Sequence, residues 1–563
     1  MNGKNLNHLY YGDNLDVLRR YVRDEAVDLV YLDPPFNSNQ DYNVLFGERN
    51  GTRAAAQIKA FEDTWRWDEG AARANQEVVE SGGPVSLALQ AFRTFLGETD
   101  MLAYFAMMAP RLVELRRVLK PMGAIYLHCD PTASHYLKML LDAIFGPQNF
   151  LSEVIWRRTG THSSARRWGP VHDVILVYAK GEAPHTWNRL YVPLSDQHRR
   201  RHYRLEDGEG RTYTHGELTG PGVRHGRSGT AWRGFDVTAI GRHWTTTVEN
   251  LEEMNAAGRI YFPPDGGWPR LIRYEDESKG RALGDVWEDI PPINMKARER
   301  LGYPTQKPQA LLERIIAAST NEGDTVLDPF CGCGTTVAAA QALDRRWIGI
   351  DITHLAIGLI KIRLKDSFGP NVAETYSVIG EPVSVPDAET LAAEDPYQFQ
   401  WWALGLVGAR PVDQKKGADK GIDGRLFFHD ERAGETKQIV FSVKAGQLHA
   451  TYVRDLRGVV EREKAEIGVL ISMDEPTKAM RTEAAGAGFY VSPWGTHPRI
   501  QLRTVTELLA GKGIDYPPTK ADSTFKKAPR VTYDEPTTQE LPLEMVAERP
   551  EAPKRPRRRK DSG

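Results

Sequence analysis

The chain is poor in cysteine, carries almost no net charge and has no long hydrophobic run. Three cysteines in 563 residues exclude a disulfide framework and favour a reducing compartment, so we expect a cytoplasmic protein. No apolar stretch approaches the roughly 20 residues of a membrane span, and residues 2–14 are too polar for a signal-peptide core. A net charge of −2 does not by itself indicate a nucleic-acid partner, so the local distribution of basic residues matters more.

Composition predicts a globular protein of several domains. Hydrophobic residues make up 40% and charged residues 26% of the chain, which is ordinary for water-soluble proteins, and the length exceeds a single core. We expect α/β structure over residues 1–185 and 301–385, separated by a glycine-rich, weakly periodic region over residues 186–300. Residues 390–515 read as a second small α/β domain, and residues 520–563 as a disordered basic tail.

Two short motifs each follow an apolar strand. Residues 27–32 run into Asp33-Pro34-Pro35-Phe36, and residues 325–327 run into Asp328-Pro329-Phe330-Cys331-Gly332-Cys333-Gly334-Thr335-Thr336. Each motif therefore places an acid at the carboxyl edge of a sheet, which is where open α/β sheets bind their ligands.

These motifs resemble those of a known enzyme family. The first is similar to the catalytic signature of amino-group DNA methyltransferases, and the second to their S-adenosylmethionine loop. The order, catalytic motif first, resembles the β class, which includes the Mod subunits of type III restriction-modification systems. Residues 11–14 and 303–308 also match family motifs, so the resemblance covers roughly residues 5–385. It implies a permuted Rossmann-like methyltransferase sheet with a target recognition domain inserted at residues 186–300.

The resemblance implies a catalytic role for residues 33–36. The exocyclic amine of a base is a poor nucleophile, because its lone pair is delocalised into the ring. Asp33 would accept its N–H protons, with the Pro34 carbonyl as a second acceptor, while Pro34 and Pro35 stiffen the turn. Phe36 would stack on a base flipped out of duplex DNA. Methylation of an amine requires no cysteine nucleophile.

The cofactor site is expected to draw on both halves of the sheet. Gly332 and Gly334 allow close backbone approach, and the helix start that follows can receive a carboxylate. Asp351, at the end of the next strand, suits the ribose hydroxyls. A nicotinamide cofactor is disfavoured because the loop lacks a third glycine, and Cys331 and Cys333 have no partners for a metal. The cofactor-binding residues that we expect are Asp13, Thr305, Lys307, Asp328, Phe330, Gly332, Gly334, Thr335 and Asp351.

Arginine, histidine and aromatic residues gather within residues 186–300. The cluster at residues 198–204 is followed by further basic residues, with Trp232, Trp244, Trp268 and Tyr274 among them. Basic residues with interleaved aromatics suit phosphate contact and stacking on bases or sugars. In isolation a solvated, irregular insertion is the better interpretation, but the position between two methyltransferase motifs favours DNA contact.

Residues 390–515 resemble the PD-(D/E)xK nuclease fold in its Mrr-like version. Asp423 and Lys444 fit that pattern and would share a Mg²⁺ site in an active nuclease. Ser442 stands where a second ligand is expected, and Glu394 or Glu435 could compensate. Three interpretations stay open, namely a working nuclease, a nuclease-like domain kept for DNA or protein contact, and an unrelated α/β module.

The sequence thus predicts an S-adenosylmethionine-dependent DNA methyltransferase acting on N6 of adenine in duplex DNA. The alternatives are a cytosine N4 methyltransferase and a DNA-binding scaffold of a restriction or phage-defence complex. The partners expected are double-stranded DNA, a restriction or defence subunit and, in a dimer, a second copy of the chain. No membrane partner is expected.

Overall fold

A computed structural model describes residues 7–35, 69–160, 168–294, 305–412, 421–428 and 436–517, with residues 297, 299–301, 303 and 430. The described residues divide into two compact units, one built from the parts of the chain before residue 189 and after residue 283, and the other from residues 189–283. The predicted roles of Phe36, Glu435 and the tail at 520–563 fall outside the described residues.

The first unit contains a nine-stranded sheet in the order β14-β4-β5-β3-β2-β15-β16-β1-β17. Strand β5 is antiparallel to both of its neighbours, whereas every pair from β3 to β17 is parallel. The strands are β1 (Asn7–Tyr11), β2 (Val27–Leu32), β3 (Leu119–Cys129), β4 (Phe150–Arg157), β5 (His172–Ala179), β14 (Val286–Trp287), β15 (Thr325–Asp328), β16 (Arg346–Asp351) and β17 (Tyr376–Ile379). Strands from both predicted halves interleave, which confirms the predicted permuted α/β sheet.

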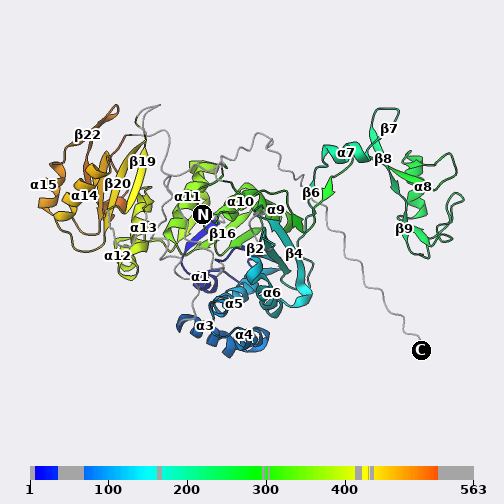
Figure 1. The fold of residues 1–563 in the computed structure, drawn as a ribbon, viewed down its shortest axis with the longest axis horizontal. Helices are drawn as coiled ribbons and strands as arrows, with labels where there is room; N and C mark the ends of the chain where they lie inside the picture. Colours follow the sequence, from blue (N-terminus) through cyan, green and yellow to red (C-terminus); the bar gives the residue numbers. More distant parts are fainter. Residues whose placement is uncertain are drawn as a thin grey trace, which may run out of the picture. The chain divides into compact units, whose positions relative to one another are not determined.

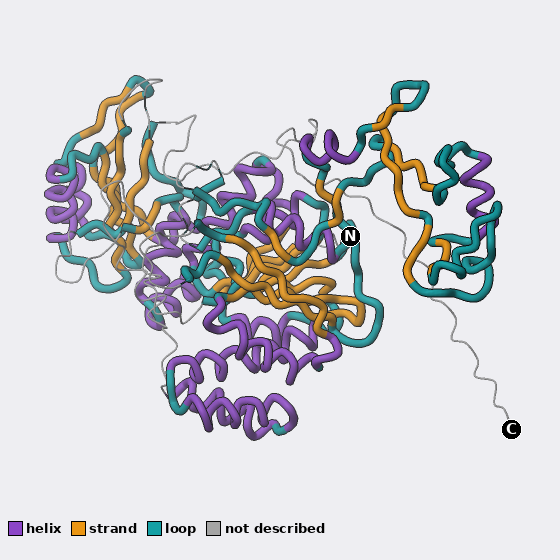
Figure 2. Tube along the Cα trace, turned by 45° about the vertical axis from the view of Figure 1, so that its right-hand side comes forward, coloured by secondary structure: helices purple, strands orange, loops and turns teal. Residues whose placement is uncertain are grey.

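Helices cover both faces of this sheet (Figures 1 and 2). Helices α1 (Asn14–Tyr21), α3 (Glu69–Ser81), α4 (Gly83–Leu96), α5 (Asp100–Val118) and α6 (Pro131–Phe145) lie on one side, and α9 (Gln309–Ser319), α10 (Thr335–Ala342) and α11 (His354–Phe368) on the other. The 3₁₀ helices are η1 (Pro147–Asn149) and η2 (Pro370–Thr375).

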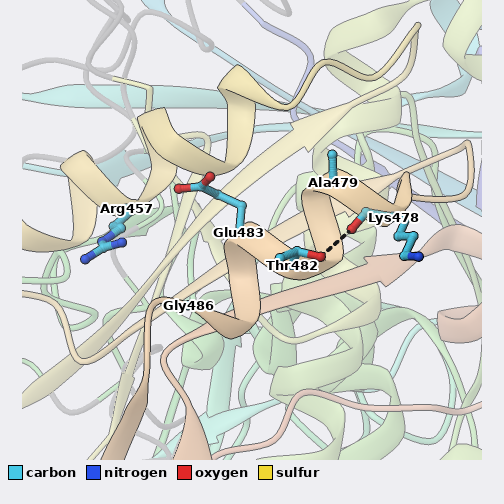
Figure 3. Close-up of a pocket in the computed structure, with 6 residues that line it drawn as sticks. All are labelled: Arg457, Lys478, Ala479, Thr482, Glu483 and Gly486. Carbon is cyan, nitrogen blue, oxygen red and sulfur yellow. Dashed lines mark hydrogen bonds between the residues drawn. The ribbon is translucent and has the colours of Figure 1, made fainter.

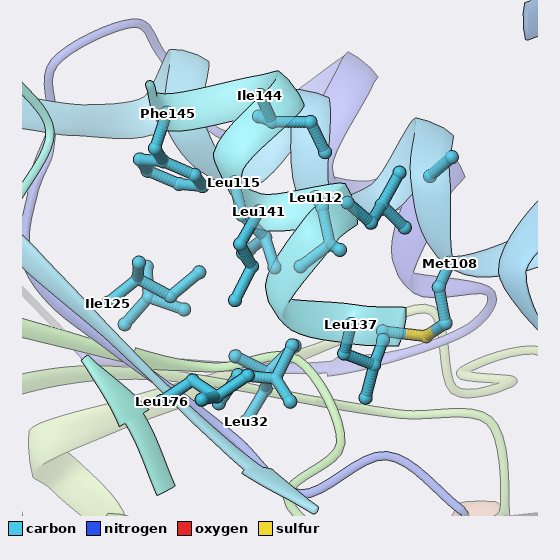
Figure 4. Close-up of a cluster of buried hydrophobic side chains, with 14 of the residues drawn as sticks. Leu32, Met108, Leu112, Leu115, Ile125, Leu137, Leu141, Ile144, Phe145 and Leu176 are labelled. Carbon is cyan, nitrogen blue, oxygen red and sulfur yellow. The ribbon is translucent and has the colours of Figure 1, made fainter. Parts of the chain in front are cut away.

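The strands bury alternate residues against the two helix layers, as the period of two along a strand requires. Val30 and Leu32 of β2 join the core beneath α5 and α6, while Leu29 and Tyr31 join the opposite core with α9 and α10. Figure 4 shows the first of these cores, where Leu32 packs near Leu137 of α6. A sheet buried on both faces fixes the strand ends that carry the motifs.

The C-terminal part of this unit has its own sheet, in the order β18-β19-β20-β21-β24, and a separate hairpin of β22 and β23. Its elements are α12 (Val385–Glu394), α13 (Pro396–Leu406), β18 (Arg410–Pro411), β19 (Gly424–Phe428), β20 (Lys437–Lys444), α14 (Thr451–Arg462), β21 (Ile467–Ser472), α15 (Lys478–Ala485), β22 (Phe489–Ser492), β23 (Gly495–Pro498), β24 (Ile500–Thr504) and α16 (Val505–Leu509). Separate apolar cores lie on its two faces. Among all the helices described, none is long and apolar enough to span a bilayer.

The second unit has more regular structure than its sequence suggests. A four-stranded sheet, β11-β12-β8-β7, is accompanied by two short two-stranded pairs. Its elements are β6 (Tyr191–Val192), α7 (Asp196–His202), β7 (Leu205–Glu206), β8 (Thr212–Glu217), β9 (Thr219–Pro221), β10 (Arg242–Trp244), α8 (Val248–Ala256), β11 (Ile260–Tyr261), β12 (Arg270–Tyr274) and β13 (Arg281–Ala282). Trp232 and Trp244 are 3% and 0% exposed and form the core of this unit. The interpretation of these two rings as stacking surfaces for DNA was therefore wrong.

Candidate functional site

The two motif strands lie side by side in the sheet. Val326 of β15 pairs with Leu29 of β2, and Leu327 pairs with Val30. Asp328 ends β15, and Asp33 follows the end of β2 at the same edge. The two acids that the sequence singled out are thus brought to neighbouring strand ends.

Asp33 is engaged by a cation from the segment before α9. The ammonium group of Lys307 donates to Oδ2 of Asp33. The side chains of Lys307 and Asp33 are 14% and 15% exposed, so the pair is largely screened from water. Lys307 was expected to contact the cofactor, and in this structure it contacts Asp33.

A buried chain of polar groups lies next to Asp33. The hydroxyl of Tyr31 is 2.9 Å from Nδ1 of His128, and Nε2 of His128 is 3.1 Å from Oδ2 of Asp173. Arg158 lies 3.1 Å from the other oxygen of Asp173. Tyr31, His128 and Asp173 are at most 3% exposed, so the chain ties β2 to β3 and β5 without water. These residues were not predicted, because the strands that they join are far apart in the sequence, although they are neighbours in the sheet.

Burial controls the charge states along this chain. Burial, followed by the charges of Asp33 and Asp328, raises the pKa of Tyr31 well above its ordinary value. Burial alone would raise the pKa of Asp173, but the hydrogen bond and charge of His128, together with Lys307 and Arg158, bring it below its ordinary value. Asp173 therefore stays ionised and Tyr31 stays protonated.

The loop after β15 is held by its own first residue. Oδ1 of Asp328 accepts from the backbone N–H of Phe330 at 3.0 Å, and Oδ2 accepts from the hydroxyl of Thr336 at 2.5 Å. Burial raises the pKa of Asp328 to about 7. This carboxyl group turns inward to brace the loop, which is a structural task that the sequence did not reveal.

Both loop glycines have left-handed backbones, with φ of 49° at Gly332 and 74° at Gly334. A Cβ on Gly332 would lie 3.1 Å from the ring of Tyr303, and one on Gly334 would lie 2.7 Å from Cγ1 of Ile360. Gly334 is thus required by the packing of α10 on α11, in addition to the ligand approach that we predicted.

Asp351 closes the loop from the neighbouring strand. Its Oδ2 accepts from the backbone N–H of Gly332 at 2.9 Å, and its Oδ1 accepts from the backbone N–H and hydroxyl of Thr353, each at 2.9 Å. Burial raises the pKa of Asp351 to about 6. A carboxylate held at the end of a parallel strand beside a glycine loop fits a ribose diol.

Asp13 caps α1 and lies against a buried arginine. Its Oδ1 accepts from the N–H of Leu15 at 2.8 Å, and its Oδ2 accepts from Nη2 of Arg111 at 2.6 Å. Arg111 also donates to Asn14, whose amide donates to the carbonyl of Pro329 at 2.8 Å. This bridge fixes the Asp13 turn to the cofactor loop. Arg111 was missed, although a charge inside an otherwise apolar helical stretch was a usable signal.

The remaining predicted residues differ in their surroundings. Pro34 is buried and Pro35 exposed, while Thr305 is exposed and Phe330 is half-buried. The hydroxyl of Thr335 is 3.0 Å from Nη1 of Arg363, a buried arginine of α11 that the sequence analysis also missed. No structural observation assigns Thr305 a ligand, so its role stays a prediction.

Residues 27–361 match the family model described as DNA methylase, N6_N4_Mtase. The chain belongs to this DNA methylase family. It is 35% identical over 250 residues to the type II methyltransferase M.EcaI of Enterobacter cloacae, covering 44% of this chain and 54% of that protein. It is 30% identical over 362 residues to the StyLTI Mod subunit of Salmonella typhimurium, covering 61% and 51%. The chain therefore spans about half the length of these relatives.

A third relative and a solved structure add detail. The DNA adenine methyltransferase YhdJ of Escherichia coli is 49% identical over 81 residues, covering 14% of this chain and 27% of that protein. A DNA modification methylase of Thermus thermophilus, solved with S-adenosyl-L-methionine, is 16% identical, with 67% and 100% coverage and a TM-score of 0.32. So low a score carries no weight, and the fold of this chain rests on its own strand order.

The C-terminal domain of this chain is nuclease-like. Residues 398–510 match a model described as NACHT-associated inactive Restriction Endonuclease 1. Oδ2 of Asp423 accepts from the backbone N–H of Val443 at 2.6 Å, and Ser442 is only 6% exposed. Within the described residues, no group of three or more His, Cys, Asp or Glu side chains is placed to hold a metal. Glu394 joins no such group among the described residues, and its expected compensation for Ser442 stays a prediction.

A shallow cleft of about 570 Å³ opens between α14 and α15 (Figure 3). It is lined by Arg457, Lys478, Ala479, Thr482, Glu483 and Gly486. Arg457 pairs with Glu461, and Glu483 with Arg454, so the charges around the cleft largely balance. None of the residues of the two sequence motifs lines this cleft.

Proposed function

We propose that this chain transfers a methyl group from S-adenosylmethionine to the N6 amine of adenine in duplex DNA. The observation that carries the proposal is the convergence of three acids, Asp33, Asp328 and Asp351, at the carboxyl ends of the neighbouring strands β2, β15 and β16. Membership of the N6/N4 DNA methylase family supports the same reaction.

The residues present fit the cofactor. Asp351 would accept the ribose hydroxyls, and the left-handed Gly332 would let the backbone approach the ligand closely. The start of α10 at Thr335 would receive the carboxylate of the methionine moiety. When bound, S-adenosylmethionine supplies an electrophilic methyl group on a sulfonium.

Asp33 would grip the amine to be methylated. Lys307 bonds Oδ2 of Asp33, so we assign Oδ1 to an N–H proton of the amine and the Pro34 carbonyl to the other. These bonds return electron density to nitrogen and orient its lone pair toward the methyl group. The positive charge that develops on nitrogen in the transition state lies beside the Asp33 carboxylate, which stabilises it.

Adenine is favoured over cytosine by the acid in Asp33-Pro34-Pro35-Phe36. Cytosine N4 enzymes of this class often carry serine at the position of Asp33, as the family resemblance implies. The relative YhdJ, whose name specifies adenine, is the one with 49% identity over its matched segment. Cytosine N4 methylation is the second candidate, because the two amines are chemically close.

The partner that we propose is double-stranded DNA, gripped in part by the unit of residues 189–283. A restriction or defence subunit is a further proposed partner, since one relative is a type III Mod subunit. A second copy of the chain would make a dimer. A DNA-binding scaffold without catalysis is the competing class.

The decisive experiment is modified-base sequencing of DNA from cells that express the protein, with Asp33→Ala as the matched control. We expect N6-methyladenine at one recognition sequence in the parent and none in the variant. Methylated cytosine would select the second candidate. An unmodified genome, together with no thermal shift on addition of S-adenosylmethionine, would select the scaffold.

A further inference from the structure

The loop from β16 to α11 carries the acid that we assign to the ribose. Asp351 accepts hydrogen bonds from the backbone N–H and the hydroxyl of Thr353. The Thr353 hydroxyl in turn accepts from the N–H of Ala356 at 3.2 Å and so caps α11. The position of Asp351 is therefore coupled to the first turn of α11, with only Ile352 between the acid and the capping residue.

The backbone N–H of the first residue of α11 has its hydrogen-bond acceptor in the nuclease-like domain. The backbone N–H of His354 donates to Oε1 of Gln398 at 3.2 Å, and the two residues are 4% and 8% exposed. The first N–H groups of a helix have no partner within it, and a buried N–H requires an acceptor. Here the acceptor belongs to α13, whose Phe399 and Trp402 lie in the core of the nuclease-like domain.

The His354 side chain also contacts β1, the strand that pairs with β16. Its ring stacks on Tyr11 with 3.6 Å between centroids and an interplanar angle of 18°. Tyr11 is the neighbour of Asp351 across the pair of β1 and β16. Burial raises the pKa of Tyr11, and after burial the largest causes are the charges of Asp395 and Glu394, at the start of α13 and the end of α12. The hydrogen bond from His354 to Gln398 thus joins the nuclease-like domain to a residue that packs on the strand beside Asp351.

We propose that Gln398 is a positioning residue of the S-adenosylmethionine site, and that the nuclease-like domain is retained because it completes this site. The proposal rests on the proposed function, since it assigns the ribose to Asp351. Without the acceptor on α13, the buried N–H of His354 would have no hydrogen-bond partner. The first turn of α11 would shift to give this N–H another acceptor, and it would move away from Asp351. The hydrogen bonds of Thr353 to Asp351 would then weaken, and the carboxylate would lose its alignment.

The proposal makes the two domains energetically coupled. Any partner that docks on the nuclease-like domain and shifts α13 would change the affinity for S-adenosylmethionine, and the cofactor would change the affinity for that partner by the same factor. The nuclease-like domain would then transmit the binding of a partner to the S-adenosylmethionine site as a change in cofactor affinity.

The test is calorimetric titration of the full chain with S-adenosylmethionine. Gln398→Met keeps the length of the side chain but removes the acceptor, and we expect a five- to tenfold higher Kd. Gln398→Glu keeps an acceptor at a helix N-terminus, where negative charge is favoured, and should stay within twofold of the parent. Gln400→Met, on the same helix, is the matched control and should leave the Kd unchanged.

Methylation kinetics separate positioning from general damage. Gln398→Met should raise the KM for S-adenosylmethionine and leave kcat at saturating cofactor within twofold of the parent. An unchanged Kd in Gln398→Met, with a parent that binds S-adenosylmethionine, overturns this inference alone. Equal weakening by Gln398→Met and Gln400→Met also overturns it. A parent that does not bind S-adenosylmethionine overturns the proposed function instead.

Discussion

At the residue scale, substitution of Asp33 should affect methyl transfer without affecting cofactor binding. Asp33→Ala removes the acceptor of the amine protons and the partner of Lys307, but it leaves Asp351, Gly332 and Thr335, which we assign to the cofactor, in place. We expect methyl transfer to fall by more than a hundredfold in a single-turnover assay, and the Kd for S-adenosylmethionine to change by less than threefold. Transfer within tenfold of the parent would show that Asp33 is not the amine acceptor.

The second prediction at this scale concerns pH and Asp351. Burial raises the pKa of Asp351 to about 6, so ionising this acid costs the folded protein free energy as pH rises through 6. The ribose hydroxyls require the ionised acceptor, and the Kd for S-adenosylmethionine should therefore fall between pH 5 and pH 7. Asp328, with a pKa of about 7, titrates nearby, so Asp351→Asn is needed to assign the effect.

In Asp351→Asn, affinity at pH 8 should drop by about 1.5–3 kcal/mol, the worth of a hydrogen bond to a charged group. The dependence on pH between 5 and 7 should flatten. Calorimetry at four pH values measures both effects. A parent whose affinity does not vary over this range would place the ribose acceptor elsewhere.

At the scale of single elements, the glycine loop makes a prediction about stability. Gly334→Val places a branched side chain on a left-handed residue, where its Cβ alone would overlap Ile360 of α11. Overpacking costs about 1–3 kcal/mol, and the backbone conformation costs about 1–2 kcal/mol more. Gly358→Ala, in the interior of α11 with open space around it, should instead stabilise by about 0.5–1 kcal/mol. Urea unfolding of both variants measures the contrast.

Helix α7 tests the contact with DNA. Its arginines are exposed on a seven-residue helix, and Arg199 is partly engaged by the Leu194 carbonyl. Replacing Arg199, Arg200 and Arg201 with alanine should weaken DNA binding and lower the slope of log K against log salt by roughly 0.9 for each lost phosphate contact. Binding isotherms at several salt concentrations measure the slope, and an unaltered slope would make this cluster a solvated surface only.

The same scale shows what the sequence could predict. Strands β2 and β15 were predicted because apolar runs that end in an acid are local patterns. The ion pair of Asp33 with Lys307 joins residues far apart in the chain, and the link from Tyr31 through His128 to Asp173 joins three strands, so no local pattern contained them. Trp232 looked like a surface ring because aromatic residues in a weakly periodic segment do not reveal which of them form a core.

At the scale of the whole molecule, the fold joins a methylase to a nuclease-like domain. The fold class and the order of the two methylase halves were predicted because the motifs fix them. The dependence of α11 on Gln398 was not predicted, because this hydrogen bond joins residues 44 positions apart in the chain. A chain that ends near residue 385 lacks Gln398, so we expect it to bind S-adenosylmethionine more weakly than the full chain.

The last prediction concerns Asp423, which a nuclease would use to hold Mg²⁺. In this protein Oδ2 of Asp423 accepts from the buried N–H of Val443, and Ser442 supplies no carboxylate beside it. The full chain with Mg²⁺ should therefore leave plasmid DNA uncut.

Asp423→Ala should lower the free energy of unfolding of this domain by about 1–3 kcal/mol, because a buried N–H loses its acceptor. Asp455→Ala, on an exposed turn of α14, is the control and should change it by less than about 0.5 kcal/mol. Robust cutting that Asp423→Ala abolishes would instead reveal a live nuclease, with Asp423 as a metal ligand and the hydrogen bond to Val443 secondary.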